Sequence, residues 1–347
     1  MKQFLQILFL LICFSVNAQK SDFRHINFKK ADSIANALKD HRLNNLPLLA
    51  HKLTNSLNTQ VEKFRAIHTW VCSNIESDHS FGVKTIRKRK KYKNDAIAFS
   101  KWNAEVQDVF FKRLLKDKKT ICSGYAYVIK ELSNLADIEC EIVDGYSRTV
   151  NTNVTKIDIP NHSWNAVHLS NKWYLVDATL ASGVFFINQN KFIKDYNDGY
   201  FLAEPELFAK NHYPLDEKWL LLERKPDLNQ FVKAPLVYGK TYKYEVVPIM
   251  PKNLITKVVL DDEVLFSLKI SDESKIDSIS LVLNSGLKYD KVEASSLNFK
   301  EGFLKFNYRF TKKGHYDVHI KTNEDVLVSY TVEVEKPKKG VLVAINK

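Results

Sequence analysis

The sequence predicts an α+β protein in which a region of mixed helices and strands is followed by an all-β region. Up to about residue 223, apolar side chains recur first at the 3.6-residue period of amphipathic helices and then in the short runs typical of strands. From Gly239 onward, short apolar runs alternate with turn residues, which is the pattern of a β-sandwich. A length of 347 residues fits about two such domains.

The N-terminus has the pattern of a secretory signal peptide over residues 1–18. Lys2 precedes an apolar run from Phe4 to Val16, and Val16-Asn17-Ala18 offers the small side chains that mark a cleavage site. The apolar run is too short for a helix that spans a membrane. We therefore expect an exported protein, secreted or periplasmic, that has no transmembrane anchor.

The chain is basic, with a formal net charge of +12, which falls to +11 when the signal peptide and its Lys2 are removed. Much of the excess lies in the stretch Lys84–Lys93. That stretch is either a solvated surface segment or a patch that attracts an anionic cell-surface polymer. Export and the lack of any nucleic-acid motif argue against a nucleic-acid partner.

Helical patterns precede the first chemically distinctive motif. Two short helices, around residues 32–38 and 45–53, lead into an amphipathic helix over residues 61–75. Residues 80–101 are basic without a clear period, so we expect a long loop that forms a rim of the site. A helix over residues 104–115 then delivers the chain to a cysteine.

That cysteine, Cys122, stands in the motif Thr120-Ile-Cys-Ser-Gly-Tyr-Ala126. Apolar residues continue from Tyr125 at helical spacing, so Cys122 is expected at a helix N-terminus, where orphan N–H groups and the helix dipole favour a thiolate. A buried, inert thiol is the alternative. The Cys122 backbone N–H is the expected oxyanion donor, and Trp102 and Gln107 remain open as further donors.

Two strand patterns follow, over residues 161–169 and 172–179, and the turn between them predicts an antiparallel hairpin. His162 begins the first strand and Asp177 ends the second, so the carboxylate can face and orient the imidazole. Cys122, His162 and Asp177 then supply a nucleophile, a base and a group that orients the base.

The connecting segments are predicted as a strand over residues 139–146, a loop over the cleft at 151–160, a turn at 179–183 and a polar loop at 188–199. His168 lies six positions after His162 on the same strand and faces the same side of the sheet. We assign the role of the base to His162.

The motifs T-I-C-S-G-Y-A, N-H-S-W-N-A-V and K-W-Y-L-V-D-A-T, in this order, resemble the transglutaminase-like superfamily. The resemblance is closest to its bacterial members and to its kyphoscoliosis-peptidase branch, which typically read G-x-C-x-G-Y-A, H-A-W-N-x-V and W-Y-x-x-D-x-T. It covers roughly residues 55–222. The resemblance implies a papain-like catalytic core with a triad at Cys122, His162 and Asp177, and a protein or peptide substrate.

Two positions depart from the family pattern. Thr120 stands where Gly is usual and Ser163 where Ala is usual. Neither change removes a triad member, but the larger Thr120 side chain could narrow the approach to the cleft. Residues 64–71 resemble the helix that precedes the nucleophile in this family, and residues 201–219 resemble the segment that closes the domain in the kyphoscoliosis branch.

The other candidate ligands give no metal site. Three cysteines remain after removal of the signal peptide, and Cys72 and Cys140 either pair or are buried thiols, of which we expect the latter. His68 and His79 have no further ligand at metal-binding spacing, and no acidic cluster suggests calcium control. The sequence thus predicts neither a metal nor another cofactor.

The region after residue 228 is predicted to be all β. Its last hairpin pattern, residues 314–318 and 330–334, resembles that of immunoglobulin-like domains. We place the transglutaminase-like domain at residues 19–223 and an immunoglobulin-like β-sandwich at residues 228–340. The predicted strands cover residues 242–247, 264–270, 279–283, 303–310, 316–320 and 326–334.

Two functions of different classes fit these observations. The first is an exported thiol enzyme that acts on amide or peptide bonds through a thioester, with hydrolysis favoured over cross-linking because the most similar branch is peptidase-like. The second is an inactive binding or scaffold protein with the same fold. The intact set of Cys122, His162 and Asp177 favours the enzyme, because a scaffold has no need of all three.

Overall fold

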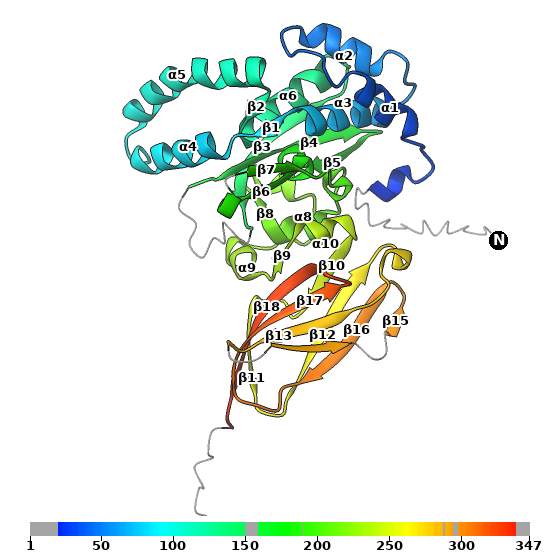
Figure 1. Cartoon of the computed structure of the whole chain (residues 1–347), viewed down its shortest axis with the longest axis vertical. Coiled ribbons are helices and arrows are strands. Elements are labelled where there is room, and N and C mark those ends of the chain that lie inside the picture. Colours follow the sequence, from blue (N-terminus) through cyan, green and yellow to red (C-terminus); the bar gives the residue numbers. More distant parts are fainter. Residues whose placement is uncertain (1–19, 150–158, 190, 287–288, 294–297, 338–347) are drawn as a thin grey trace, which may run out of the picture.

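The computed structural model describes residues 20–149, 159–189, 191–286, 289–293 and 298–337 (Figure 1). The predicted signal peptide and most of the predicted loop at residues 151–160 lie outside these residues. The described helical elements are η1 (Lys20–Phe23), α1 (Lys29–Ala37), α2 (Leu46–Thr54), α3 (Gln60–Asn74), α4 (His79–Lys91), α5 (Ala96–Lys112), the π-helical η2 (Arg113–Asp117), α6 (Cys122–Asn134), α7 (Ala178–Ser182), η3 (Ile187–Gln189), η4 (Asp198–Tyr200), α8 (Pro205–Asn211), η5 (Glu217–Leu220), α9 (Leu228–Lys233), α10 (Gly239–Lys243) and η6 (Glu273–Lys275). The described strands are β1 (Glu76–Ser77), β2 (Lys119–Thr120), β3 (Cys140–Ser147), β4 (His162–Leu169), β5 (Lys172–Val176), β6 (Gly183–Phe186), β7 (Lys191–Lys194), β8 (His212–Pro214), β9 (Leu236–Val237), β10 (Val246–Met250), β11 (Ile255–Val259), β12 (Glu263–Ile270), β13 (Ser280–Asn284), β14 (Tyr289–Glu293), β15 (Asn298–Lys300), β16 (Phe303–Arg309), β17 (Gly314–Thr322) and β18 (Asp325–Glu335).

The N-terminal part is built on an antiparallel sheet in the order β5-β4-β3-β8. Helix α6 packs against β3 and β4, and α3 packs against α6 and α1 (Figure 1). The hairpin of β4 and β5 predicted from the sequence is present, as is the predicted strand β3. This sheet and α6 carry the residues singled out by the sequence motifs.

Helix α3 shows how local sequence and packing agree in this part. Its N-terminus carries a capping box in which Thr59 and Glu62 satisfy each other's backbone N–H groups. Phe64, Ile67 and Trp70 lie on its inner face and are fully buried. The predicted helices at residues 32–38, 45–53 and 61–75 are confirmed as α1, α2 and α3.

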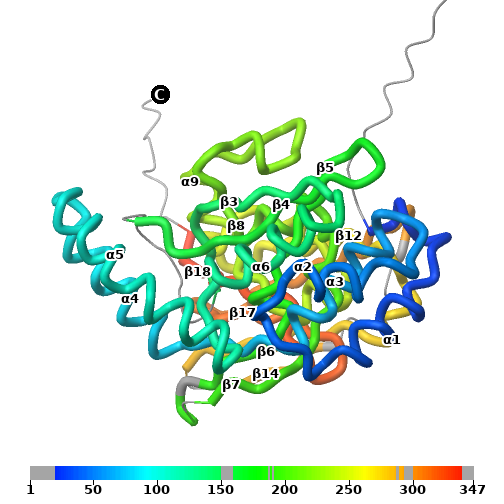
Figure 2. Tube along the Cα trace, turned by 90° about the horizontal axis from the view of Figure 1, so that it is seen from above, coloured from blue at the N-terminus to red at the C-terminus, as the bar shows by residue number. Residues whose placement is uncertain are grey.

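The prediction of a long loop over residues 80–101 is wrong, because helices α4 and α5 form a hairpin there. Asp78 and Asp95 cap the two helices by accepting hydrogen bonds from backbone N–H groups of the first turn. Phe81 and Thr85 are buried one turn apart, but the run of basic residues that follows hid this spacing in the sequence. Figures 1 and 2 both show the hairpin projecting from the body of the molecule.

Three shorter predictions also differ from the structure. Residues 178–182 form the helix α7 rather than a turn, since Asp177 caps its first turn. The predicted polar loop at residues 188–199 contains β7, which pairs with β6. Residues 242–247 were expected as one strand, but Gly239–Lys243 is the helix α10 and only β10 is extended.

The C-terminal part consists of two sheets that enclose one apolar core. One sheet has the order β10-β12-β16-β15, and the other has the order β11-β18-β17-β13-β14 with β9 beside β18. Phe266 and Leu268 from the first sheet and Val318 and Tyr330 from the second are buried in this core. Strands β11, β14 and β15 were not predicted. The chain is therefore α+β, as its sequence predicts.

The two parts are packed together through the segment that joins them. The N-terminal core continues through Val237 and Tyr242 to Val247. The ring of Tyr242 stacks on that of Tyr200 at 4.1 Å between centroids, and Lys269 of β12 pairs with Glu206 of α8. The domain limits at residues 19–223 and 228–340 stay predictions. Within the described ranges, no helix has both the length and the apolar character needed to cross a membrane.

Candidate active site

The position of Cys122 is fixed by a short pair of parallel strands and the start of a helix. β2 pairs with β1, and α6 begins at Cys122 with Ile121 as the N-cap in an extended conformation. The apolar Ile121 side chain cannot accept a hydrogen bond, so no side chain caps α6, while the N–H groups of Gly124 and Tyr125 donate to the Ile121 carbonyl. The thiol of Cys122 is half-buried. The prediction of Cys122 at a helix N-terminus is confirmed.

Close packing surrounds the first turn of α6. A Cβ atom at Gly124 would lie 1.9 Å from Oγ1 of Thr120 and 2.9 Å from Cζ of Phe110. Only glycine fits there unless the side chains of Thr120 and Phe110 move. Thr120 itself is 1% exposed, so its side chain fills the interior rather than an open approach to Cys122.

His162 and Asp177 meet at the open end of the β4–β5 hairpin. Val176 is paired with Asn165, so a continued register sets Asp177 opposite Trp164, and His162 is its diagonal neighbour on the same face. Nε2 of His162 lies 2.6 Å from Oδ2 of Asp177. The other oxygen, Oδ1, accepts a hydrogen bond from the N–H of Leu180 and so caps α7.

The protonation of the thiol and the imidazole is coupled. Burial raises the pKa of Cys122, but the hydrogen bond and charge of His162, the Ser163 backbone N–H and the charge of Arg89 outweigh it, and the net pKa is lowered. Burial lowers the pKa of His162, but Asp177 and the Cys122 sulfur raise it to about 10. Both shifts favour a thiolate–imidazolium pair.

Asp177 is fully buried and yet charged. Burial raises its pKa, but the charges and hydrogen bonds of His162 and His212 hold the pKa well below the usual range of a carboxyl. A buried carboxylate that receives several donors orients its partners and stabilises their positive charge.

His212 is the residue of this site that the sequence analysis did not assign. It lies at the start of β8, is 1% exposed, and its Nε2 atom lies 3.0 Å from the same Oδ2 of Asp177. Its ring stacks on Phe208 at 3.8 Å. Burial lowers its pKa despite Asp177, so a neutral ring donates through Nε2–H. His212 falls within residues 201–219, which resemble the segment that closes the domain in the kyphoscoliosis branch, but no local pattern indicates its partner Asp177.

The side chains of His162, Asp177 and His212 also have the composition of a metal site, with donor atoms within 4.8 Å of one another. In the structure these atoms are used for hydrogen bonds, since both imidazoles point Nε2 at one carboxylate oxygen. A zinc ion at the same place would replace these protons and break the orientation of His162.

The remaining residues singled out by sequence lie elsewhere. His79 stacks on Phe185 at 4.0 Å, and Trp102 lies against Phe99 on α5. His168 lies 3.6 Å from Glu139 and beside Trp173. The Ser163 hydroxyl donates to Asp144, and Asn165 donates to the carbonyl of Ala126.

Cys72 and Cys140 are free, buried thiols, as expected. Burial raises the pKa of both, that of Cys140 to about 12. The fully buried His68 lies beside Cys72, and its own pKa is lowered by burial to about 3. This second cysteine–histidine pair is therefore held neutral, in contrast to Cys122 and His162.

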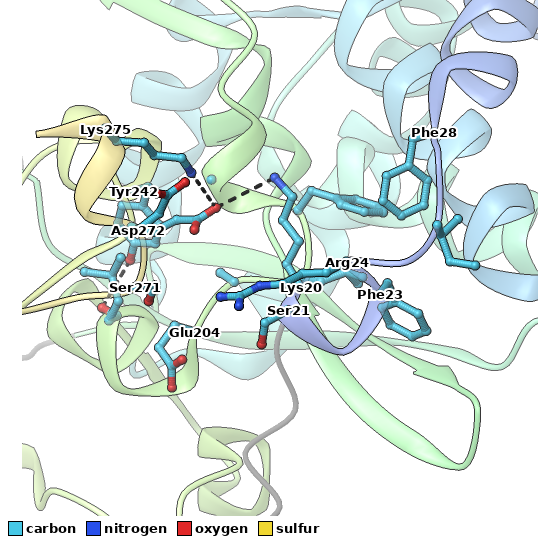
Figure 3. Close-up of a pocket in the computed structure, with 17 residues that line it drawn as sticks. Lys20, Ser21, Phe23, Arg24, Phe28, Glu204, Tyr242, Ser271, Asp272 and Lys275 are labelled. Atoms are coloured by element: carbon cyan, nitrogen blue, oxygen red, sulfur yellow. Dashed lines mark hydrogen bonds and ion pairs between the residues drawn. The ribbon is translucent and has the colours of Figure 1, made fainter. Parts of the chain in front are cut away.

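A cavity of about 580 Å³ lies between η1, the segment of residues 199–207 and the loop of residues 271–275 (Figure 3). Burial raises the pKa of Glu204 on its wall to about 7. None of Cys122, His162 and Asp177 is among the described lining residues. The thiol chemistry is thus not located in this cavity.

Comparison with known proteins places these observations among relatives. Residues 48–178 match the family model of the transglutaminase-like superfamily. The chain is 27% identical to human kyphoscoliosis peptidase over 300 residues, which are 84% of this chain and 41% of that protein. It is 25% identical to Drosophila melanogaster hillarin, over 63% of this chain and 26% of hillarin. It is 24% identical to the Caenorhabditis elegans Lim and transglutaminase domain protein ltd-1, over 78% and 36% respectively. The chain thus spans less than half the length of these relatives.

Proposed function

We propose, from the match of residues 48–178 to the family model of the transglutaminase-like superfamily, that the protein is an exported thiol enzyme acting on amide or peptide bonds. Cys122 is the nucleophile, His162 the general acid and base, and Asp177 the residue that orients His162. The superfamily generally has cysteine peptidase or acyltransferase activity and acts on protein substrates, which sets the class of reaction and of substrate.

One observation carries this proposal. Cys122 lies at a helix N-terminus, Nε2 of His162 lies 2.6 Å from Oδ2 of Asp177, and His162 lowers the pKa of the Cys122 thiol while its own pKa is raised. A thiolate is the nucleophilic form of cysteine, and an imidazolium is ready to protonate a leaving group.

In the proposed reaction, the Cys122 thiolate attacks the carbonyl carbon of the substrate amide. The N–H groups of the first turn of α6, above all that of Cys122, stabilise the oxyanion. The C–N bond then breaks as His162 gives its proton to the leaving amine, which leaves a thioester. Attack by water, from which His162 removes a proton, releases the acid and restores the thiol.

Hydrolysis is favoured over transfer to an amine because two of the most similar relatives are named peptidases. The same thioester gives cross-linking when an amine replaces water. Peptide cleavage and incorporation of a labelled amine, measured on the same preparation, distinguish the two outcomes.

Three finer features belong to this proposal. Residues 1–18 act as a cleaved signal peptide, which places the protein in a periplasm or outside the cell. The basic stretch Lys84–Lys93 contacts an anionic cell-surface polymer. The two-sheet C-terminal part is an immunoglobulin-like sandwich that packs against the catalytic part or contacts a partner.

An inactive binding protein is the second candidate. The names of hillarin and of the Lim and transglutaminase domain protein ltd-1 denote no hydrolase, so the fold occurs in proteins that are not named for an activity. If the protein only binds a partner, the Cys122 thiol is expected to react no faster than an ordinary free thiol.

Alkylation of the native mature protein with iodoacetamide across pH, read at each cysteine by mass spectrometry, tests the proposal. We expect Cys122 to react faster than a free thiol below pH 7, and to lose this advantage in His162→Ala. A rate at or below that of a free thiol contradicts the enzyme and favours the binding protein.

A further inference from the structure

The basic helix α4 presents one of its cations differently from the others. Lys84, Arg87, Lys88, Lys90 and Lys91 are exposed, whereas Arg89 is half-buried. Arg89 follows Phe81 and Thr85 at intervals of four residues, and these two are the buried residues of α4. Arg89 therefore lies on the inner face of the helix, and the exposed cations lie on the outer faces.

The inner face of α4 is turned toward the start of α6. The strands β1 and β2 pair Ser77 with Thr120, and the N–H of Asp78 donates to the carbonyl of Thr120 at 2.7 Å. A Cβ atom on Gly82 would lie 3.5 Å from Cγ2 of Ile121. The first turns of α4 thus contact the residue that precedes Cys122.

Helix geometry brings the Arg89 guanidinium back toward the same place. Gly82 and Arg89 are seven residues apart, so they lie on one face and about 10 Å apart along the axis. A helical side chain points toward the N-terminus of its helix, and an arginine extends about 6 to 7 Å from the backbone. The guanidinium is therefore directed along the inner face toward the neighbourhood of Cys122.

The charge of Arg89 lowers the pKa of the Cys122 thiol, and no residue in the described part of the chain neutralises that charge. The largest influences on the pKa of Cys122 are burial, then His162, then the Ser163 N–H. Arg89 comes next and lowers this pKa. Within the described ranges Arg89 makes no ion pair or hydrogen bond. Arginine is well suited to bind a carboxylate, because its planar fork donates two parallel hydrogen bonds.

We propose that Arg89 forms an anion-binding subsite beside Cys122, which selects substrates with a carboxylate close to the reacting carbonyl group, as in an acidic polypeptide. This inference rests on the proposed thiol chemistry and adds the substrate class. The outer cations of α4 add a field that raises the local concentration of acidic chains, and Arg89 makes the specific contact.

Iodoacetate and iodoacetamide test the subsite without a known substrate, because they alkylate a thiolate alike but only iodoacetate carries a carboxylate. The measured quantity is the ratio of the two rates at Cys122. We expect Arg89→Ala to lower this ratio about 3- to 10-fold and Arg89→Glu to lower it further, with smaller effects at high salt. Lys90→Ala, with the same loss of charge on the exposed side, should leave the ratio within about 2-fold.

A hexaglutamate peptide extends the test to polypeptides. It should protect Cys122 from iodoacetamide in the wild type and in Lys90→Ala but not in Arg89→Ala, whereas hexaglutamine should protect in none. If Arg89→Ala and Lys90→Ala lose protection and lower the rate ratio equally, only the overall positive field of α4 attracts the anion. That result overturns the subsite. A second outcome also overturns the subsite. If dextran sulfate still protects Cys122 in Arg89→Ala, and hexaglutamate protects it only weakly, helix α4 binds a polyanionic polymer instead of an acidic polypeptide.

The outcome for the subsite is separate from the outcome for the proposed function. The absolute rate with iodoacetamide reports whether Cys122 is activated, and the ratio of the two rates reports whether Arg89 selects an anion. A slow thiol with a ratio that depends on Arg89 supports the subsite and contradicts the enzyme. If Cys122 reacts quickly but the ratio of the two rates is unchanged in Arg89→Ala, the enzyme is supported and the subsite is contradicted.

Discussion

Nε2 of His212 lies 3.0 Å from Oδ2 of Asp177, although 35 residues separate them. The same oxygen accepts from Nε2 of His162 at 2.6 Å. One buried carboxylate thus holds two imidazoles. The pKa of His162 is raised, so its ring carries a proton, whereas burial lowers the pKa of His212 and keeps its ring neutral. His212 is therefore a residue that positions Asp177, and through it His162.

Replacing His212 by Phe keeps a ring that can stack on Phe208 and removes the donor to Asp177. Because the carboxylate is fully buried, the loss of one donor should cost about 1–3 kcal/mol in the free energy of unfolding. It should also raise the pKa of Asp177 and lower that of His162. Urea denaturation and the pH profile of Cys122 alkylation measure these two effects.

His212→Gln serves as the matched control, since its side-chain amide can donate from nearly the position of Nε2. It should recover most of the wild-type pH profile, even where stability is only partly restored. A profile of His212→Phe identical to that of the wild type would show that His212 acts on packing alone.

Asp177 combines two roles that substitution can separate. Asp177→Asn removes the charge but keeps an oxygen that caps α7, whereas Asp177→Ala removes both. We expect either variant to lower turnover by about 10²- to 10⁴-fold. Asp177→Ala should be less stable than Asp177→Asn by about 1 kcal/mol, the usual effect of an N-cap. Equal stability of the two contradicts the capping role.

The low pKa of Asp177 also predicts how stability depends on pH. A carboxyl whose pKa is lower in the folded protein than the ordinary 3.8 contributes stability that is fully present above pH 3.8. That contribution is lost as the pH falls toward the pKa of the folded state. Denaturation midpoints between pH 3 and 7 should therefore fall less steeply in Asp177→Asn than in the wild type.

The rate of Cys122 alkylation should depend on pH in two steps. Burial raises the pKa of the thiol, and His162 is the largest of the influences that lower it, ahead of the Ser163 N–H and the charge of Arg89. The first rise is expected below pH 9, the ordinary pKa of a thiol, and a second change near pH 10, where His162 loses its proton. In His162→Gln the first step should move to higher pH and the second should vanish. If the first rise stays at the same pH in His162→Gln, the pKa of Cys122 does not depend on His162, which contradicts the coupling of the two groups.

The three described cysteines should differ sharply in reactivity. Cys72 and Cys140 are about 1% exposed and have raised pKa values, whereas Cys122 is half-buried with a lowered one. Native protein should take up one iodoacetamide, at Cys122, and urea-unfolded protein should react at all three. Cys122→Ser should leave the native protein unmodified, and modification of Cys72 or Cys140 there would contradict their burial.

Two glycines near the thiol should respond in opposite ways to alanine. A Cβ at Gly124 meets Thr120 and Phe110 at 1.9 and 2.9 Å, so Gly124→Ala should destabilise the protein by about 1–3 kcal/mol. At Gly82 the nearest atom is an ordinary 3.5 Å away, on Ile121. Gly82→Ala should therefore leave stability unchanged or raise it by up to about 1 kcal/mol, because alanine favours helix. Urea denaturation measures both.

Several elements could be predicted because their signals are local. Helix α3 follows a capping box and a 3.6-residue apolar period, and the β4–β5 hairpin joins its two strands by a short turn. The predicted helix over residues 104–115 overlaps α5, but its first turns and the whole of α4 were missed. In α4, consecutive lysines and arginines mask the inward positions of Phe81 and Thr85. The strand β11 was missed because it lies parallel to β18, a pairing between segments far apart in the chain.

The sequence by itself determined the resemblance to the transglutaminase-like superfamily, the α+β class, the helix that starts at Cys122 and the hairpin that carries His162 toward Asp177. The helix and the hairpin each depend on residues within about fifteen positions of one another, so period and turns are enough to predict them. The resemblance depends on three motifs in order, and the class on the pattern of the whole chain. The catalytic role of these residues stays a prediction. Only the tertiary structure placed His212 on Asp177 and set the first turns of α4 against Ile121, the residue before Cys122. The first follows from β8 lying beside β3, and the second from β1 lying beside β2. Such contacts between distant segments depend on how whole elements bury their apolar faces, which no local pattern in the sequence records.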